Sequence, residues 1–269
     1  MDNPGFRFFG IHIAYYGVIL TFAILVACAM CFYLTNLKNK REGSEVYYKD
    51  VVFDMALIII PLGIIGARVM FVIFDPNHTL LDFFDFRSGG IAIYGAIILG
   101  ALGLAILALI KKKSFFLFAD VVVVCLILAQ AIGRWGNFVN GEVYGVAITN
   151  SAFQWFPIAV FIEGWCCDLH GYLGGWHLAT FFIESMFNFA GFALLLYIFL
   201  KSKHLGITCA VYLIFYGVVR AMLETVRLHN LMIGSLQISF LISLISIVAG
   251  AIILVTIYYK NKQQLEGVK

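Results

Sequence analysis

Apolar residues fill most of the chain in long runs, and polar residues gather in the short segments between the runs. A run of about 20 apolar residues is long enough to cross the hydrocarbon core of a bilayer as a helix. Lipid offers no partner to an unpaired backbone group, so each run is expected to be helical. The pattern predicts membrane-spanning helices over residues 12–34, 51–74, 90–110, 115–134, 178–200, 207–227 and 235–258.

The composition agrees with this pattern. Hydrophobic residues make up 62% of the 269 residues and charged residues only 12%, whereas a soluble domain is roughly half apolar and a quarter charged. The chain is therefore expected to be an all-α integral membrane protein of the multi-pass type. We expect one membrane domain, residues 1–269, whose surroundings are a lipid bilayer rather than a nucleic acid.

The lysines alternate from loop to loop. All 11 fall between predicted helices 1 and 2, 3 and 4, or 5 and 6, or in the C-terminal tail. Cytoplasmic loops carry an excess of basic residues, so these segments and the C-terminus are expected to be cytoplasmic and the N-terminus outside. The long segment 136–177 between helices 4 and 5 then forms a small extracytoplasmic head or re-entrant insertion. We assign no role to its neighbouring cysteines, Cys166 and Cys167.

Polar residues of six spans fall at one depth. Charges inside a membrane span are costly and are functional candidates by default. With the orientation fixed, all of these residues lie near the outer leaflet. Guanidinium groups bind phosphate through two parallel hydrogen bonds. We therefore expect an anionic headgroup there. The residues are Tyr16, Arg68, Tyr94, Arg134, Glu184 and Arg220.

The sixth span has a polar stripe. Tyr216, Arg220 and Glu224 are spaced i, i+4, i+8 and share one helix face. Besides headgroup binding, the simpler interpretation is an ion pair between Arg220 and Glu224. Asp54 and Asp120 lie near the cytoplasmic ends of their spans, where helix capping or an interhelical hydrogen bond is favoured.

Small residues open the third span, in "RSGGIAIYGAIILGALG". Gly89 and Gly90 either permit close helix packing or let a lipid approach the backbone. No phosphate loop and no hydrolase motif is present in the chain.

One stretch, "GRWGNFVNGEVYG" at 133–145, resembles the signature of the prolipoprotein diacylglyceryl transferase family. The matching positions are Gly133, Arg134, Gly136, Asn137, Phe138, Asn140, Glu142 and Gly145. "AYYGVIL" with Tyr16, "IGARVMFVIF" with Arg68, and "YGVVRAMLETVR" with Tyr216, Arg220 and Glu224 are similar to further family segments.

The resemblance implies transfer of a diacylglyceryl group from phosphatidylglycerol to the lipobox cysteine thiol of a prolipoprotein, at the outer leaflet of a bacterial cell membrane. Glycerol phosphate leaves and a thioether forms, and this implied reaction calls for no metal or other cofactor. Arg134 and Arg220 would stabilise the departing phosphate. Asn137 and Asn140 would hold glycerol hydroxyls or the arginine, and Glu142 would accept the thiol proton or orient Arg134.

The sequence departs from the family pattern in the third span, where Tyr94 in "GGIAIYGA" stands at the place of a family histidine. Tyr94 either acts as the base with the help of nearby arginines or binds the headgroup. His177 is displaced from its family motif and is expected to be a boundary residue. Two rival functions are an anion transporter, which would normally show internal repeats, and a lipid-binding scaffold.

Overall fold

The computed structural model describes residues 4–9, 11–74, 92–162, 174–227, 232–233 and 236–266. Within these residues, seven helices are long and apolar enough to cross a membrane, as the sequence predicts. They are α1 (Tyr15–Glu42), α2 (Val51–Phe74), α3 (Ile93–Ile110), α4 (Phe115–Val139), α6 (Thr180–Lys201), α7 (Ile207–Glu224) and α8 (Ile238–Glu266). Gly89, Gly90, Cys166 and Cys167 lie outside the described residues.

The described residues also form three antiparallel pairs of strands. These are β1 (Gly5–Phe8) with β2 (Ile11–Ala14), β3 (Ala159–Ile162) with β4 (Gly175–Leu178), and β5 (Met232–Ile233) with β6 (Leu236–Gln237). A short 3₁₀ turn, η3 (Ser151–Phe153), precedes β3. The chain falls into two compact units, one made of Met1–Met30 and Asp120–Lys269, the other of Cys31–Ala119. They are called the first and the second unit below.

Several helix ends differ from their predicted positions. Helix α1 continues to Glu42 instead of ending at 34, and α8 continues to Glu266 instead of ending at 258. Helix α4 does not stop at 134 but continues to Val139, because the charge of Arg134 is paired inside the protein and does not end the helix. Helix α7 ends at Glu224 rather than at 227. The backbone of residues 226–227 pairs with Gly145 and Val146 instead of continuing the helix.

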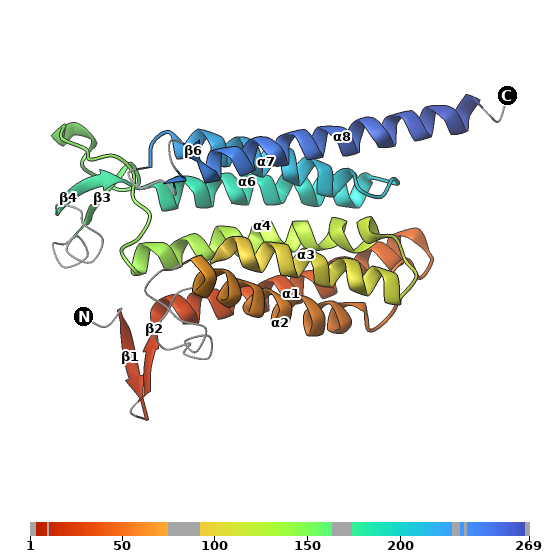
Figure 1. Ribbon diagram of the computed structural model, residues 1–269, viewed down its shortest axis with the longest axis horizontal. Coiled ribbons are helices and arrows are strands. Elements are labelled where there is room, and N and C mark those ends of the chain that lie inside the picture. The colour runs from red at the N-terminus through yellow and green to blue at the C-terminus, as the bar shows by residue number, and fades with distance from the viewer. Residues whose placement is uncertain are drawn as a thin grey trace. The chain divides into compact units, whose positions relative to one another are not determined.

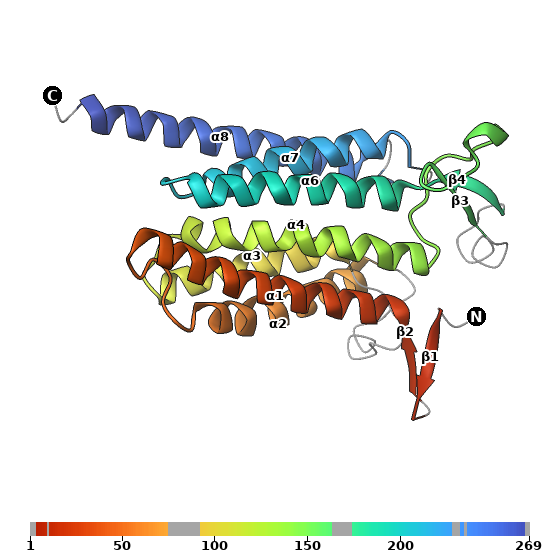
Figure 2. The same ribbon diagram turned by 180° about the vertical axis from the view of Figure 1, so that it is seen from behind.

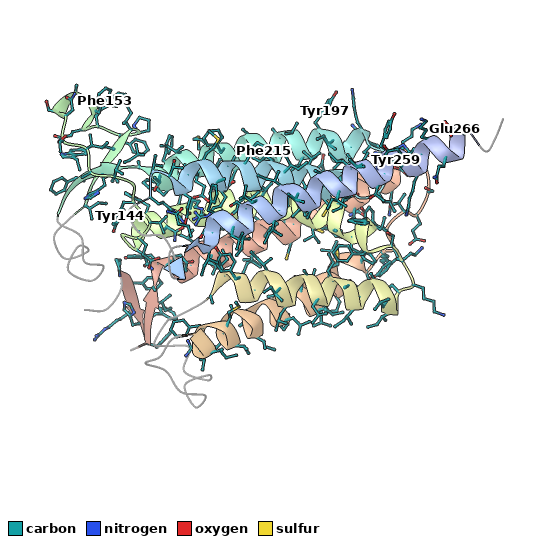
Figure 3. All side chains as sticks on the ribbon, turned by 45° about the horizontal axis from the view of Figure 1, so that its top comes forward. Tyr144, Phe153, Tyr197, Phe215, Tyr259 and Glu266 are labelled. Atoms are coloured by element: carbon teal, nitrogen blue, oxygen red, sulfur yellow. The ribbon has the colours of Figure 1, made fainter. Side chains whose placement is uncertain are left out.

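In the first unit, α6, α7 and α8 run side by side (Figures 1 and 2). Helices α7 and α8 approach closely at two glycines. A Cβ on Gly217 would lie 2.8 Å from the carbonyl oxygen of Ser243, and one on Gly250 would lie 2.6 Å from that of Ala210. Figure 3 shows Tyr144 and Phe153 at the end of this unit where the β3–β4 hairpin lies, and Tyr259 and Glu266 at the opposite end.

The predicted structural roles of both membrane aspartates are confirmed. In the second unit, Asp54 accepts a hydrogen bond from the Tyr48 hydroxyl at 2.7 Å and pairs with Lys111, the residue that follows α3, at 2.6 Å. Burial, followed by this bond to the carboxylate, raises the pKa of Tyr48 well above its ordinary value. In the first unit, Asp120 accepts from the backbone amides of Gly206 at 2.7 Å and Cys209 at 2.8 Å. Asp120 thus caps the first turn of α7.

Replacing Asp120 with alanine is expected to lower the free energy of unfolding by about 1–2 kcal/mol, the usual effect of losing a helix cap. The two amides that it bonds are buried, so no water replaces the lost acceptor. Thermal unfolding in detergent measures the loss. Asp120→Asn retains one acceptor oxygen and should fall between wild type and Asp120→Ala; equal stability of all three proteins would contradict the capping role.

Candidate active site

Three arginines and two glutamates gather at one end of the first unit. Arg134 of α4 forms an ion pair with Glu184 of α6. Nη2 of Arg220 lies 2.9 Å from Oε2 of Glu224, one turn further along α7, and Nη2 of Arg227 lies 3.9 Å from Oε2 of Glu184. Both carboxylate side chains are 1% exposed, and the arginine side chains are 11–14% exposed. We call these five residues the arginine cluster.

The arginine cluster has more positive than negative charge. Burial, and then the nearby charge of Arg220, lower the pKa of Arg227 from its ordinary value to about 10. The negative charge of Glu184 raises the pKa of Arg227, but by less than burial and Arg220 lower it. Nη1 of Arg220 and Nε of Arg227 are buried and have no hydrogen-bond partner among the described residues. An anion with several acceptor oxygens would supply both the charge and the missing partners.

The end of the 133–145 motif holds the cluster's backbone in place. The amide of Gly145 donates to the carbonyl of Leu178 at 3.0 Å, and the amide of Val146 donates to that of Val226 at 3.1 Å. These bonds join the end of the motif to the last residue of β4, just before α6, and to the segment that carries Arg227. A Cβ on Gly145 would lie 2.8 Å from side-chain atoms of both Leu178 and Thr180, so this close joint requires glycine.

Glu142 is held beside the cluster by its own segment. Nδ2 of Asn140 donates to Oε1 of Glu142 at 2.8 Å. The next residue, Val143, has a left-handed φ of 63°, which is rare for a β-branched side chain. Its carbonyl accepts a 2.8 Å hydrogen bond from Oγ1 of the buried Thr180. This tertiary bond keeps the segment in a conformation that the sequence alone would not favour.

Two predicted tyrosines also lie at this end of the first unit. The Tyr16 ring packs against α4, where a Cβ on Gly136 would be 2.9 Å from its Cδ2 atom. Tyr16 is within electrostatic reach of Glu142 and Arg134. Tyr216 is within hydrogen-bonding reach of the Arg134 guanidinium. The carbonyl of Asn137 accepts from the Glu142 amide at 2.9 Å.

The predicted residues of the second unit are described within that unit. Arg68 of α2 is only 1% exposed, and its guanidinium carbon lies 5.3 Å from the centroid of the Phe71 ring. Tyr94 is half-buried in the first turn of α3. The amide of Ala92 donates to the carbonyl of Ala67 at 3.1 Å, so the start of α3 is tied to α2 next to Arg68. The roles of Arg68 and Tyr94 remain predictions.

The structure assigns partners that sequence reasoning did not. Glu184 is indicated by its depth, but its pairing with two arginines has no signal in the spacing. Arg227 is foreseeable only as a continuation of the α7 stripe. Ser239 of α8, whose hydroxyl accepts a 3.1 Å hydrogen bond from Arg220, has no signal because serine is common in membrane helices. His177 is buried, and its Nδ1 lies 3.2 Å from the carbonyl oxygen of Gly145; its place at the membrane boundary stays a prediction.

Arg227→Gln is expected to lower any activity that depends on anion binding by about 100-fold, the lower end of the range for losing one preorganised donor, without lowering stability. The lowered pKa means that folding disfavours the charged form, so below pH 10 a neutral side chain relieves the folded state of that cost. Wild-type stability should accordingly rise, not fall, as the pH passes 10. Thermal unfolding at pH 7 checks the stability of the variant, and a large loss of stability in Arg227→Gln would contradict the prediction. Thermal unfolding of wild type on either side of pH 10 checks the pH dependence.

Metal-binding clusters are not found in the described part of the chain, where no group of three or more His, Cys, Asp or Glu side chains could hold an ion. The arginine cluster, with Glu142 beside it, is suited to binding an oxyanion and to stabilising negative charge that develops on it.

Comparison with known proteins gives a consistent result. Residues 5–256 match the family model described as prolipoprotein diacylglyceryl transferase. The chain is 37% identical over 269 residues to the phosphatidylglycerol–prolipoprotein diacylglyceryl transferase of Clostridioides difficile (strain 630), covering 98% of this chain and 99% of that protein. It is 34% identical to the protein of the same description from Finegoldia magna, covering 97% of each chain. A Clostridium botulinum relative is also 34% identical, with 98% of this chain and all of the relative covered.

Proposed function

Because this chain belongs to the prolipoprotein diacylglyceryl transferase family, we propose that it transfers the diacylglyceryl group of phosphatidylglycerol to a prolipoprotein cysteine. The sulfur forms a bond to the terminal glycerol carbon of the diacylglyceryl group while the bond from that carbon to the phosphate oxygen breaks. The thiol proton goes to a base, and the products are a thioether and glycerol phosphate. The observation that carries this proposal is the excess of positive charge in the arginine cluster.

The three arginines bind the lipid phosphate. Negative charge on the phosphate grows as the carbon–oxygen bond breaks, so guanidinium groups already fixed around it stabilise the transition state more than the bound lipid. Arg134 is fixed by Glu184, and Arg220 by Glu224. The carboxylates therefore orient the arginines without neutralising all of their charge.

Glu142 accepts the thiol proton. A cysteine thiol has a pKa near 8.5 and attacks as the thiolate. The carboxylates Glu184 and Glu224 are already paired with arginines, whereas Glu142 accepts from the neutral amide of Asn140. Asn137, Tyr16 and Tyr216 line this end of the first unit as lipid-binding residues, together with Glu224. From the second unit, Arg68, Tyr94, Gly89 and Gly90 are the further candidates for substrate contact.

The multi-pass protein lies in the bacterial cell membrane with its lysine-rich loops in the cytoplasm and its arginine cluster at the outer leaflet. Both substrates, a phospholipid and a precursor anchored by its signal helix, reach the cluster from within the membrane. The segment between α4 and α6 is then an extracytoplasmic head. Its aromatic side chains Phe153, Trp155 and Phe156 are about half exposed, which suits the membrane–water interface. The head guides the lipobox cysteine to the bound lipid.

The decisive experiment mixes detergent-purified protein, phosphatidylglycerol and a peptide with a lipobox cysteine. Release of glycerol phosphate with a matching mass gain on the peptide is expected. A cysteine-to-serine peptide is the control and should stay unmodified. Lipid binding without release would favour a scaffold, and anion flux in liposomes without release would favour a transporter.

A further inference from the structure

A second set of polar residues lies one helical turn below the arginine cluster in the first unit. Gln130 precedes Arg134 by four residues on α4, Tyr212 precedes Tyr216 by four on α7, and Asn188 follows Glu184 by four on α6. Four residues of helix rise about 6 Å. Because α4 and α7 run toward the cluster and α6 runs away from it, all three steps lead in the same direction, away from the cluster along the helix axes.

Contacts on both sides of Asn188 show which helix it faces. On α6, Ser185 donates to the carbonyl of Ala131 of α4 at 2.8 Å. A Cβ on Gly191 would lie 2.6 Å from Cδ1 of Ile127, also on α4, and 2.4 Å from the ring of Phe215 on α7. Asn188 lies three residues from each of these contacts and on the same face. It therefore faces α4 between the levels of Ala131 and Ile127, which is the level of Gln130.

Three of the four side-chain amide atoms of Asn188 and Gln130 lack a hydrogen-bond partner in the part of the chain that the structure describes. Asn188 is 0% exposed, and neither its Nδ2 nor its Oδ1 has a hydrogen-bond partner among the described residues. Gln130 donates through Nε2 to the Tyr212 hydroxyl at 3.0 Å, but its Oε1 is buried without a partner in the same set. Buried amides without partners are costly. Together these atoms offer one donor group and two acceptors, the complement of a small molecule that carries hydroxyl groups.

We propose that Asn188 and the amide oxygen of Gln130 bind a hydroxyl of the phosphatidylglycerol headgroup while the arginines above bind its phosphate. The inference rests on the proposed function. The glycerol hydroxyls are a few bonds from the phosphorus atom, which matches a separation of about one helical turn. Below this level, α4 presents apolar residues that are fully buried, among them Val121, Val124 and Ile127. The polar residues therefore do not continue as a path across the membrane, which favours a headgroup site.

The site would select by headgroup chemistry. A neutral glycerol satisfies the amides without adding charge. An ethanolamine headgroup would bring an ammonium group close to a cluster that already has excess positive charge, and it offers no hydroxyl to the amide groups. Water shares the hydroxyl chemistry of glycerol and is the alternative occupant that the experiment must separate.

The test compares two lipids on two enzymes, with the lipobox peptide as acceptor and kcat/KM as the readout. Phosphatidylethanol carries an ethyl group in place of the headgroup glycerol. Wild type is expected to prefer phosphatidylglycerol over phosphatidylethanol by about 10- to 100-fold. Asn188→Leu should lose this preference, so that the ratio falls to about 1–3, because its kcat/KM falls for phosphatidylglycerol and not for phosphatidylethanol.

A matched control removes a hydroxyl that already has a partner. Tyr197→Phe on α6 removes a hydroxyl that accepts a 2.9 Å hydrogen bond from Nζ of Lys201 and leaves Asn188 and Gln130 untouched, so it should keep the wild-type lipid preference. Thermal unfolding of Asn188→Leu should match or exceed wild type, since leucine removes two unsatisfied atoms. An equal fall of kcat/KM for both lipids in Asn188→Leu, or a wild type that does not discriminate, would overturn the proposal in favour of bound water. Absence of transfer by wild type with either lipid would instead refute the proposed function.

Discussion

Arg134→Lys is expected to lower transfer from phosphatidylglycerol by roughly 100- to 1,000-fold, which is the range for losing one preorganised donor to a developing oxyanion. Lysine keeps the positive charge and can still pair with Glu184. However, an ammonium group is a point charge that cannot donate two parallel hydrogen bonds to phosphate while contacting Glu184. The loss should therefore fall mainly on kcat, measured as glycerol phosphate released in the purified system.

Arg134→Ala is the stronger substitution but has a second effect. It leaves the fully buried carboxylate of Glu184 without its main partner, and breaking a buried ion pair typically costs about 3–5 kcal/mol. The double variant Arg134→Ala, Glu184→Gln removes that charge and should regain much of the stability without regaining activity. Arg41→Lys, at the exposed end of α1, is the matched control and should transfer normally. Near-normal activity of Arg134→Lys would refute the proposed role of this residue.

Gly95→Ala is expected to prevent the second unit from packing. Helices α2 and α3 cross with backbone against backbone, and a Cβ on Gly95 would lie 2.0 Å from the carbonyl oxygen of Gly66. Overpacking of flexible side chains costs about 1–3 kcal/mol, and here rigid backbone must move, so the loss should exceed that range. Thermal unfolding in detergent and the yield of monodisperse protein report it.

The same helices provide the control for this prediction. On α3, a Cβ on Gly100 would meet only Cγ2 of Ile59 at 3.6 Å, and on α2, a Cβ on Gly63 would be 3.8 Å from the carbonyl oxygen of Ala96. Gly100→Ala and Gly63→Ala should therefore fold as wild type does. Gly66→Ala should resemble Gly95→Ala, since its Cβ would lie 2.3 Å from the Gly95 carbonyl oxygen. Normal stability of Gly95→Ala would show that the helices do not cross there.

Long-range pairing explains why part of the site was predictable and part was not. Arg134, Arg220 and Glu224 stand out in the sequence because charged residues are rare in apolar spans, and the i, i+4 spacing of the last two already implies their ion pair. The pairing of Arg134 with Glu184 depends on how α4 and α6 are aligned, which neither helix's pattern specifies. Arg227 lies after the end of α7, and its position is set by hydrogen bonds to a segment about 80 residues earlier.

By itself, the sequence determined the seven apolar helices and the family motif. It also determined at which end of each helix the charged residues lie. These depend on local hydropathy and helical periodicity, which each segment carries independently of its neighbours. Only the tertiary structure decided which charges pair, that Asp120 caps α7, that Gly66 and Gly95 meet, and that Asn188 lies buried with no hydrogen-bond partner among the described residues. Each of these depends on the rotation and alignment of one helix against another, and many arrangements of equally apolar surfaces satisfy the same hydropathy pattern.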